Sequence, residues 1–222
     1  ATPVHSATDR VFHALYAAVI SLKMPPGTKV SEIEIAKQME VSRQPVRDAF
    51  FRLSELGFLA IRPQRPTLIT KISERAVLEA AFVRVALEVE CLRAAITRLT
   101  PEAVARLRDN LAQQHAALAL PDKARFHAVD EAFHATLCDL AGQPHVWRLI
   151  QEQKAHMDRV RFLTLSETRR SGVLAEHGAI VDAMEAGDTP QAERLLRDHL
   201  RNIQTVLSDI RQDYPDYFDP IA

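Results

Sequence analysis

The sequence predicts a mostly α-helical protein, with an N-terminal winged helix-turn-helix domain over residues 1–72 and a C-terminal bundle of six helices over residues 73–222. In the first 72 residues, three helical segments precede two strand-like runs, which is the order of a winged helix-turn-helix. Beyond residue 73 the apolar segments keep helical spacing, and proline or glycine separates most of them. A chain of 222 residues is long enough for one small and one larger domain.

The first two helices are predicted from their end signals. The first is expected from about Thr8 to Leu22, and Pro25-Pro26-Gly27 ends it. Its buried face is predicted to comprise Val11, Leu15, Val19 and Leu22. Ser31-Glu32-Ile33-Glu34 has the spacing of a capping box, which predicts a short second helix to about Met39.

The third helix is expected to start after the N-cap Ser42 and to stop at Gly57. Pro45 falls in its first turn, where a missing N–H costs no hydrogen bond. Its buried face is predicted to comprise Val46, Ala49, Phe50 and Leu53. Polar side chains are exposed at its start, and this end of such a helix enters the DNA major groove. These side chains belong to Ser42, Arg43, Gln44 and Arg47.

Two short strands complete the N-terminal domain, over residues 58–62 and 67–71, with residues 63–66 between them. The charge of this domain supports DNA binding. Residues 1–72 hold ten Lys and Arg against six Asp and Glu, a net charge of +4, which leaves −5 for the remainder of a chain whose total is −1. A basic unit beside an acidic one fits nucleic-acid binding by the basic unit only.

Six helices are expected in the C-terminal domain. Thr100-Pro101, Pro121-Asp122 and Asp188-Thr189-Pro190 supply helix starts. The predicted helices cover residues 74–99, about 101–120, about 122–141, about 144–165, about 167–186 and about 190–212. The tail over residues 214–218 is expected to be irregular.

Cysteine usage and hydropathy indicate an intracellular protein. Cys91 and Cys138 lie in apolar helical surroundings, and we interpret them as reduced core residues. Charged residues break every apolar run before it could span a bilayer. The stretch from Val11 to Leu22 is amphipathic and follows Asp9 and Arg10, unlike a secretory signal. We therefore expect a cytoplasmic protein.

The C-terminal domain contains a candidate metal site. Asp130 and His134 are four residues apart and share one helix face, while His177 and His199 lie on two later helices. If the helices converge, three imidazoles and a carboxylate suit a divalent transition metal, with zinc first and nickel, manganese, cobalt or iron as alternatives. Spacing alone leaves open that these are surface histidines and that Asp130 simply pairs with His134.

Charged residues near apolar segments supply candidates for binding an effector. Arg84 interrupts an apolar run and needs water, a partner or a ligand, and Glu88 one turn later is its simplest partner. Arg159 and Arg161 could face solvent or line a pocket. An arginine opposite a bound metal would form a two-point clamp for a carboxylate.

Together these motifs resemble the GntR superfamily of bacterial transcription regulators, in its FadR-like branch with an all-helical effector-binding (FCD) domain. The DNA-binding signature of that family is similar to Ser31-Glu32-Ile33-Glu34-Ile35-Ala36 followed by residues 41–49 of this chain. In the second domain, Asp130-x-x-x-His134, Glu176-His177-Gly178-Ala179-Ile180 and His199 resemble the metal-binding FCD variant. The resemblance covers residues 8 to 212.

The resemblance implies a homodimer that binds a palindromic operator and usually represses neighbouring catabolic genes. A small carboxylate metabolite would bind at the metal and alter operator affinity. Carried onto this sequence, the resemblance implies that Arg43 and Arg47 contact DNA with help from Ser42 and Gln44, while Arg65 serves the wing. Arg84 matches the arginine that faces the ligand pocket.

Two positions depart from the family pattern. Glu40 stands where the turn between the two helices usually has glycine, and a carboxylate there would weaken non-specific DNA affinity slightly. The wing tip usually reads Arg-Gly, but here it is Arg65-Pro66. Because proline cannot adopt a glycine-only turn, a different wing shape is expected.

The sequence favours a ligand-responsive repressor without enzymatic activity, and it leaves two alternatives open. A site of three histidines and one aspartate could activate water in a metal-dependent hydrolase, although no further acid or base stands at a defined spacing from these residues. Alternatively, the metal could be purely structural and clamp three helices together. Under that hypothesis, a chelator would lower the melting temperature and leave the binding of small acids intact.

Overall fold

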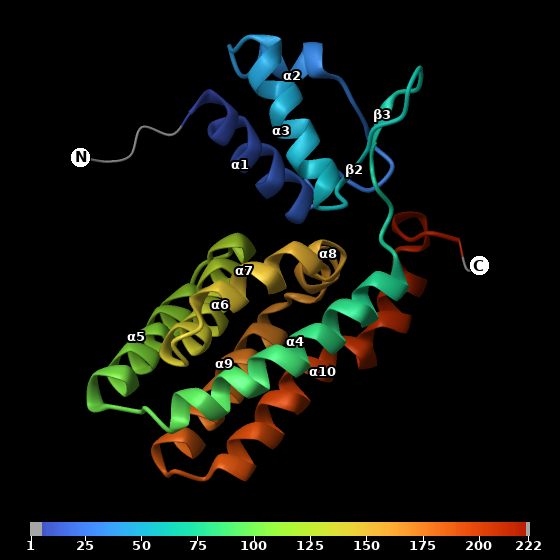
Figure 1. Ribbon diagram of the computed structural model, residues 1–222. Coiled ribbons are helices and arrows are strands. Elements are labelled where there is room, and N and C mark those ends of the chain that lie inside the picture. The colour runs from blue at the N-terminus through green and yellow to red at the C-terminus, as the bar shows by residue number, and fades with distance from the viewer. Residues whose placement is uncertain (1–5, 221–222) are drawn as a thin grey trace.

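The computed structural model describes residues 6–220 and contains two helical units that meet near residues 70–73 (Figure 1). Residues 1–5 and 221–222, which belong to the two predicted domains, lie outside the described part. The predicted fold class is confirmed, since a winged helix-turn-helix unit precedes an all-helical bundle. Figure 1 shows the first unit seated over the end of the bundle where α7 and α8 lie.

The N-terminal unit packs three helices against a small sheet. Its elements are α1 (Ala7–Ile20), β1 (Lys29–Val30), α2 (Glu32–Gln38), α3 (Arg43–Glu55), β2 (Leu59–Ala60) and β3 (Thr67–Ile69). The antiparallel sheet has the order β1-β3-β2, with Lys29 opposite Leu68 and Leu59 opposite Ile69. Strand β1 is absent from the sequence prediction, because two residues carry no periodicity and become a strand only by pairing with β3.

The boundaries of α1, α2 and α3 agree with the prediction to within about two residues, but two local details were wrong. Helix α1 stops at Ile20, and Leu22 leaves the helix at φ +57°, so Ile20 takes the buried position expected for Leu22. Ser31 and Ser42 precede α2 and α3, yet neither side chain makes a capping hydrogen bond. The predicted buried face of α3 is confirmed.

The C-terminal unit contains seven α-helices in the described residues, one more than predicted. They are α4 (Glu74–Ile96), α5 (Pro101–Leu118), α6 (Lys123–Leu140), α7 (Pro144–Gln153), α8 (Ala155–Thr164), α9 (Glu167–Glu185) and α10 (Thr189–Asp213). The extra boundary falls at Lys154, where no proline or glycine marks a break. The Lys154 ammonium is buried and pairs with Glu131 of α6 and Asp158 of α8. We attribute the break to this inward-turned side chain.

The bundle core lies between α4, α6, α9 and α10, and α4 runs beside α10 (Figure 1). Cys91 and Cys138 are buried free cysteines, as predicted. The tail is more ordered than expected, because a 3-10 turn over Pro215–Tyr217 lets Phe218 bridge to Ile72. Across the described residues, no helix combines the length and apolar character needed to cross a membrane.

Candidate functional site

The bundle brings the four predicted metal-site residues to one buried point. Asp130 and His134 project from α6, His177 from α9 and His199 from α10. One potential ligand atom from each residue lies within 4.8 Å of the other three, and all four side chains are buried. Helical spacing places the first pair on one face, whereas only the packing of three helices brings the other two histidines to it.

The Nε2 atoms of the three imidazoles face one another. Nε2 of His199 lies 3.2 Å from Nε2 of His177 and 3.4 Å from Nε2 of His134. Nε2 of His177 is also 4.0 Å from Oδ1 of Asp130. This Oδ1 is buried and has no hydrogen-bond partner among residues 6–220, while Oδ2 of Asp130 pairs with Arg161. The site therefore presents an unpaired carboxylate oxygen beside three ring nitrogens.

Each imidazole meets an acceptor on its outer side. Nδ1 of His199 is hydrogen-bonded to Oε2 of Glu176 at 2.6 Å, and Nδ1 of His134 lies 2.6 Å from Oε2 of Glu88, an ion-pair contact without hydrogen-bond alignment. Nδ1 of His177 lies 3.0 Å from the amide oxygen of Gln114. When Nδ1 carries the proton and donates outward, a neutral ring directs the Nε2 lone pair inward. This arrangement orients metal-binding histidines in many proteins.

The surroundings of His177, His199 and Asp130 keep these side chains in the protonation states that bind cations. It lowers the pKa of His177 well below its usual range and the pKa of His199 to about 4, so both rings are neutral near pH 7. Burial alone would raise the pKa of Asp130, but the Arg161 guanidinium holds it well below its ordinary value. The constellation therefore includes one carboxylate and the neutral rings of His177 and His199.

A cavity of about 180 Å³ adjoins the site at His199, one of its four residues. Its charged and polar lining comprises Arg84, Arg161, Arg169, Thr164, His199 and Asn202. Its apolar lining comprises Met157, Leu165, Val173, Leu200, Ile203 and Val206. Nε of Arg84 donates to Glu88 at 2.5 Å, but Nη2 of Arg84 is buried without a hydrogen-bond partner among the described residues. The cavity is therefore flanked by a guanidinium with a free donor.

The four predicted effector residues lie in different places. Two line the cavity, one lies behind the site, and one points away from the cavity. Arg84 and Arg161 both line the cavity. Glu88 lies behind the site, wholly buried between Arg84 and His134, so we reassign it from effector contact to support of His134.

Arg159 points away from the cavity, toward the N-terminal unit. Its Nη1 donates to the carbonyl of Thr70 at 2.6 Å, and its Nη2 lies 2.8 Å from Nδ1 of His156. Nδ1 of His156 also accepts from the backbone N–H of Ser73 at 3.1 Å. Successive helical positions face different directions, so Arg161 reaches the cavity while Arg159 holds the linker between the units. Arg159 is therefore excluded from the candidate effector ligands.

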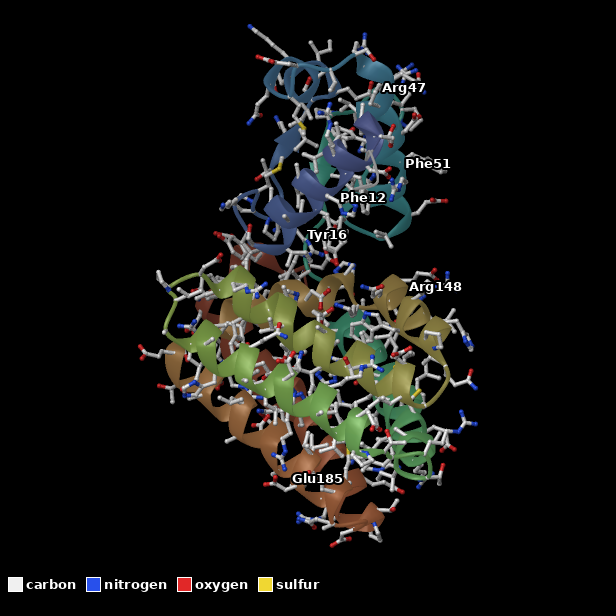
Figure 2. All side chains as sticks on the ribbon, turned by 90° about the vertical axis from the view of Figure 1, so that its left-hand side faces the viewer. Phe12, Tyr16, Arg47, Phe51, Arg148 and Glu185 are labelled. Atoms are coloured by element: carbon white, nitrogen blue, oxygen red, sulfur yellow. The ribbon has the colours of Figure 1, made fainter. Side chains whose placement is uncertain are left out.

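The predicted DNA-contacting residues lie on the exposed surface of the N-terminal unit. Ser42, Arg43, Gln44, Arg47 and Arg65 are all exposed. The Arg43 and Arg47 side chains are 58% and 59% exposed and lie within 3.6 Å of the Glu32 carboxylate. Gln44 donates to Asp48 at 2.8 Å. Figure 2 shows Arg47 pointing outward from α3, on the side that also carries Phe51.

Each of the two units matches the model of a known protein family. The model of the bacterial regulatory proteins of the gntR family matches residues 7–69, and the FCD-domain model matches residues 79–202. The chain is 33% identical over 217 residues to the HTH-type transcriptional repressor RspR of Escherichia coli (strain K12), covering 97% of this chain and 95% of that protein. The chain belongs to the GntR family.

Two solved structures share the fold of this GntR-family chain. E. coli McbR/YncC matches with a TM-score of 0.77 at 20% identity, over 95% of this chain and 100% of that one. A GntR transcriptional regulator from Rhodococcus sp. RHA1 matches with a TM-score of 0.76 at 25% identity, over 92% of this chain and 99% of that one. The family models and the similarity to RspR identify the protein as a DNA-binding transcriptional regulator, and the solved structures show the shared fold.

The two sequence departures from the GntR pattern have structural consequences. Glu40, in the turn before α3, adopts φ +54°, the left-handed conformation that favours glycine. In the wing, Gln64 takes φ +57° and Arg62 accepts a hydrogen bond from the N–H of Arg65. The left-handed residue of the wing is thus Gln64. Pro66 follows the turn and does not need a positive φ.

Sequence reasoning missed four polar residues around the site of this GntR-family chain. They are Asn110, Gln114, Arg169 and Glu176. Asn110 and Gln114 are buried and stand four apart on α5, a spacing that could have marked them as one buried polar face. Arg169 binds both carboxylate oxygens of Glu176, at 2.5 and 3.0 Å. No local sequence signal distinguishes that pair from an ordinary exposed one.

Proposed function

We propose that this GntR-family regulator is a repressor whose operator affinity changes when a small carboxylate binds at a metal site in the FCD domain. The observation that carries the proposal is the convergence of three inward-facing imidazole nitrogens and one unpaired carboxylate oxygen beside a cavity with a free arginine donor. Membership of a family of DNA-binding regulators favours this function over the hydrolase that the sequence left open.

The donor set fits a divalent transition metal. Ligand atoms about 2.0–2.1 Å from a tetrahedral ion lie about 3.3 Å from one another. The observed Nε2 separations of 3.2 and 3.4 Å match this spacing. Where all three Nε2 atoms carry lone pairs, these repel one another without a cation between them, and the bare Oδ1 of Asp130 needs a positive partner. Asp130, His134, His177 and His199 would hold the ion, with zinc the first candidate.

A metal bound here supplies a positive centre that accepts an oxygen of an incoming carboxylate. The chain supplies the other half of the site. Nη2 of Arg84 is available to donate to the same carboxylate, and burial makes such a charge-assisted hydrogen bond strong. Arg161 is already paired with Asp130 and Glu131, so we assign it mainly to holding Asp130.

The cavity favours a small acid that places its carboxylate at Arg84 and a carbon chain against the apolar part of the wall. An apolar cavity of about 150 Å³ admits benzene, and this cavity of about 180 Å³ is comparable. Its apolar wall includes Val173, Leu200 and Ile203, which offer no hydrogen bonds to a strongly polar ligand. A short-chain acid fits this cavity because its carboxylate can accept a hydrogen bond from Arg84 while its carbon chain packs against the apolar wall.

DNA binding is assigned to the exposed start of α3 and to the wing. In this proposal two copies of the chain place their α3 helices in half-sites of a palindromic operator. Arg43 and Arg47 would leave Glu32 to contact DNA, since both pairs are largely solvated and therefore weak. Arg65 extends the contact from the wing.

Three measurements on the full-length protein test the proposal. The first is metal analysis of the protein as purified, followed by a thermal-shift screen of small organic acids with and without a chelator. The second measures affinity by fluorescence anisotropy for an operator selected from randomised DNA, with and without each acid that binds. The third is light scattering, which should give the mass of a dimer. We expect acids that bind only with metal and that change operator affinity.

Variants on one helix make the test specific. Arg84→Met should abolish acid binding even in protein saturated with metal, because Arg84 donates to the acid. Its loss also leaves Glu88 unpaired behind His134, so the acid is titrated only into variant protein whose metal content has been matched to that of the wild type. Arg75→Met is the matched control, because Arg75 lies on the same helix with its side chain 87% exposed. Acids that bind equally well to chelated protein would instead indicate a purely structural metal and would contradict the proposal.

A further inference from the structure

We propose that Asn110 and Gln114 form a one-directional hydrogen-bond relay that holds His177 in the tautomer required to bind metal. The role of His177 as a ligand rests on the proposed function, but the direction of the relay rests on hydrogen-bond chemistry alone. The relay crosses from α6 through α5 to α9. It thereby links the backbone next to Asp130 with a histidine on another helix.

The relay begins at a group that cannot donate. The backbone carbonyl of Val129 accepts from Nδ2 of Asn110 at 3.0 Å, which fixes the orientation of that amide. Oδ1 of Asn110 therefore faces Gln114 and accepts from its Nε2 at 2.7 Å. Because the nitrogen of Gln114 is used there, its oxygen faces His177. An amide oxygen only accepts, so Nδ1 of His177 at 3.0 Å must carry the proton.

The consequence is a lone pair on Nε2 of the neutral His177 ring, directed at Asp130 and His199. In the opposite tautomer, a lone pair on Nδ1 would face the oxygen of Gln114, and both buried atoms would lose their hydrogen bond. Phe133 adds a second restraint by stacking on the His177 ring, with centroids 4.0 Å apart and planes 14° from parallel. Ring plane and tautomer are thus set by different neighbours.

An amide is the appropriate acceptor at this position. Asn110 and Gln114 are 6% and 0% exposed, so a carboxylate there would add a charge at considerable cost. Glu88 and Glu176 support the other two histidines, and each of these carboxylates is paired with an arginine, Arg84 and Arg169 respectively. Gln114 supplies the same acceptor without a charge. Asn110 and Gln114 are positioning residues, because they act on the ion only through His177.

The tautomer can be observed directly in the metal-free protein. Nitrogen NMR of full-length, chelated protein with ¹⁵N-labelled histidine distinguishes a protonated Nδ1 from a protonated Nε2, and a His177→Gln variant assigns the signals. We expect His177 with its proton on Nδ1. In Gln114→Met, which keeps the length of the side chain without an acceptor, we expect both tautomers and a zinc affinity lower by about 10–100-fold.

The neighbouring Gln113 provides the matched control. It lies on the same helix but is exposed, and its amide donates to Asp109, so Gln113→Met should leave the His177 signals and zinc affinity unchanged. A wild-type His177 with its proton on Nε2 would overturn the relay, even if Gln114→Met failed to fold. Unchanged zinc affinity in a folded Gln114→Met variant would overturn the positioning role. If His177 carries its proton on Nδ1 but the protein binds no zinc, the result would contradict the proposed function and leave the relay standing.

Discussion

Oε2 of Glu88 lies 2.6 Å from Nδ1 of His134, and both side chains are completely buried. The other oxygen of Glu88 accepts from Arg84, so one carboxylate joins a cavity arginine to a candidate metal ligand. Burial alone would raise the pKa of Glu88, but Arg84 and His134 together lower it below its ordinary value. Glu88 is therefore charged, and it can both orient His134 and hold the Arg84 side chain at the cavity.

The first prediction concerns this carboxylate. Glu88→Gln removes the charge that faces Nδ1 of His134, so we expect metal affinity to fall by about 10–100-fold, measured by competition with a chromogenic chelator. Glu90→Gln is the control, because Glu90 lies two residues along the same helix with its side chain 70% exposed. Equal losses in the two variants would show that the effect is unrelated to His134.

Acid should destabilise the metal-free protein through its buried imidazoles. Burial lowers the pKa of His199 to about 4, and burial together with Arg159 lowers the pKa of His156 to about 4. Below about pH 6.5 the unfolded chain binds protons at these rings that the folded protein does not bind until about pH 4. Stability is therefore lost as the pH falls through that window, and we expect Tm to decline from about pH 7 to about pH 5.

Calorimetry of chelated protein at several pH values checks this dependence. His156→Gln should make the decline of Tm shallower, because the variant has one buried imidazole fewer to protonate on unfolding. His115→Gln serves as the control, since His115 is exposed on α5 and should leave the slope unchanged. A Tm that rises toward pH 5 would contradict the prediction.

Arg159 should contribute stability by joining the two units. Arg159→Ala leaves the Thr70 carbonyl and Nδ1 of His156 without their guanidinium partner at a buried position. We expect the free energy of unfolding to fall by about 1–3 kcal/mol in urea titrations. Arg148→Ala, on the exposed side of α7 (Figure 2), should change it by less than about 0.5 kcal/mol. Similar losses in both variants would argue against the linker contact.

Arg47 should contribute to DNA affinity. Arg47→Ala should weaken binding to the selected operator by about 1–3 kcal/mol if Arg47 contacts a base, measured by anisotropy at fixed salt. Contact with phosphate alone would weaken all DNA sequences about equally and reduce the salt dependence. Arg194→Ala removes an exposed arginine from α10 in the other unit and should leave operator affinity unchanged.

The left-handed conformation of Glu40 predicts a stabilising substitution. An L-residue at φ +54° costs about 1–2 kcal/mol, which glycine avoids, although glycine also makes the unfolded chain more flexible. We expect Glu40→Gly to raise the free energy of unfolding by about 0.5–1 kcal/mol in urea titrations. Glu34→Gly, at an exposed position inside α2, should lower it by about 1 kcal/mol. The two substitutions therefore differ in sign.

Local signals predicted the secondary structure well wherever neighbouring residues decide it. Helix starts are predicted at Thr100-Pro101, Pro121-Asp122 and Asp188-Thr189-Pro190. In the structure, the side chains of Thr100, Asp122 and Asp188 each accept a hydrogen bond from a backbone N–H two or three residues later. The break at Lys154 could not be predicted in this way. It depends on Glu131, a residue of another helix that no local pattern links to position 154.

By itself, the sequence determined the order of the two units, the helices with most of their ends, and the shared face of Asp130 and His134. These features depend on bonded neighbours and on the 3.6-residue helical repeat. Tertiary structure alone decided that His177 and His199 meet that face, that Glu88, Gln114 and Glu176 support the three rings, and that Arg159 turns away. Hydrogen bonds and ligand contacts require atoms within a few ångströms, and only the packing of separate helices brings residues so distant in sequence that close.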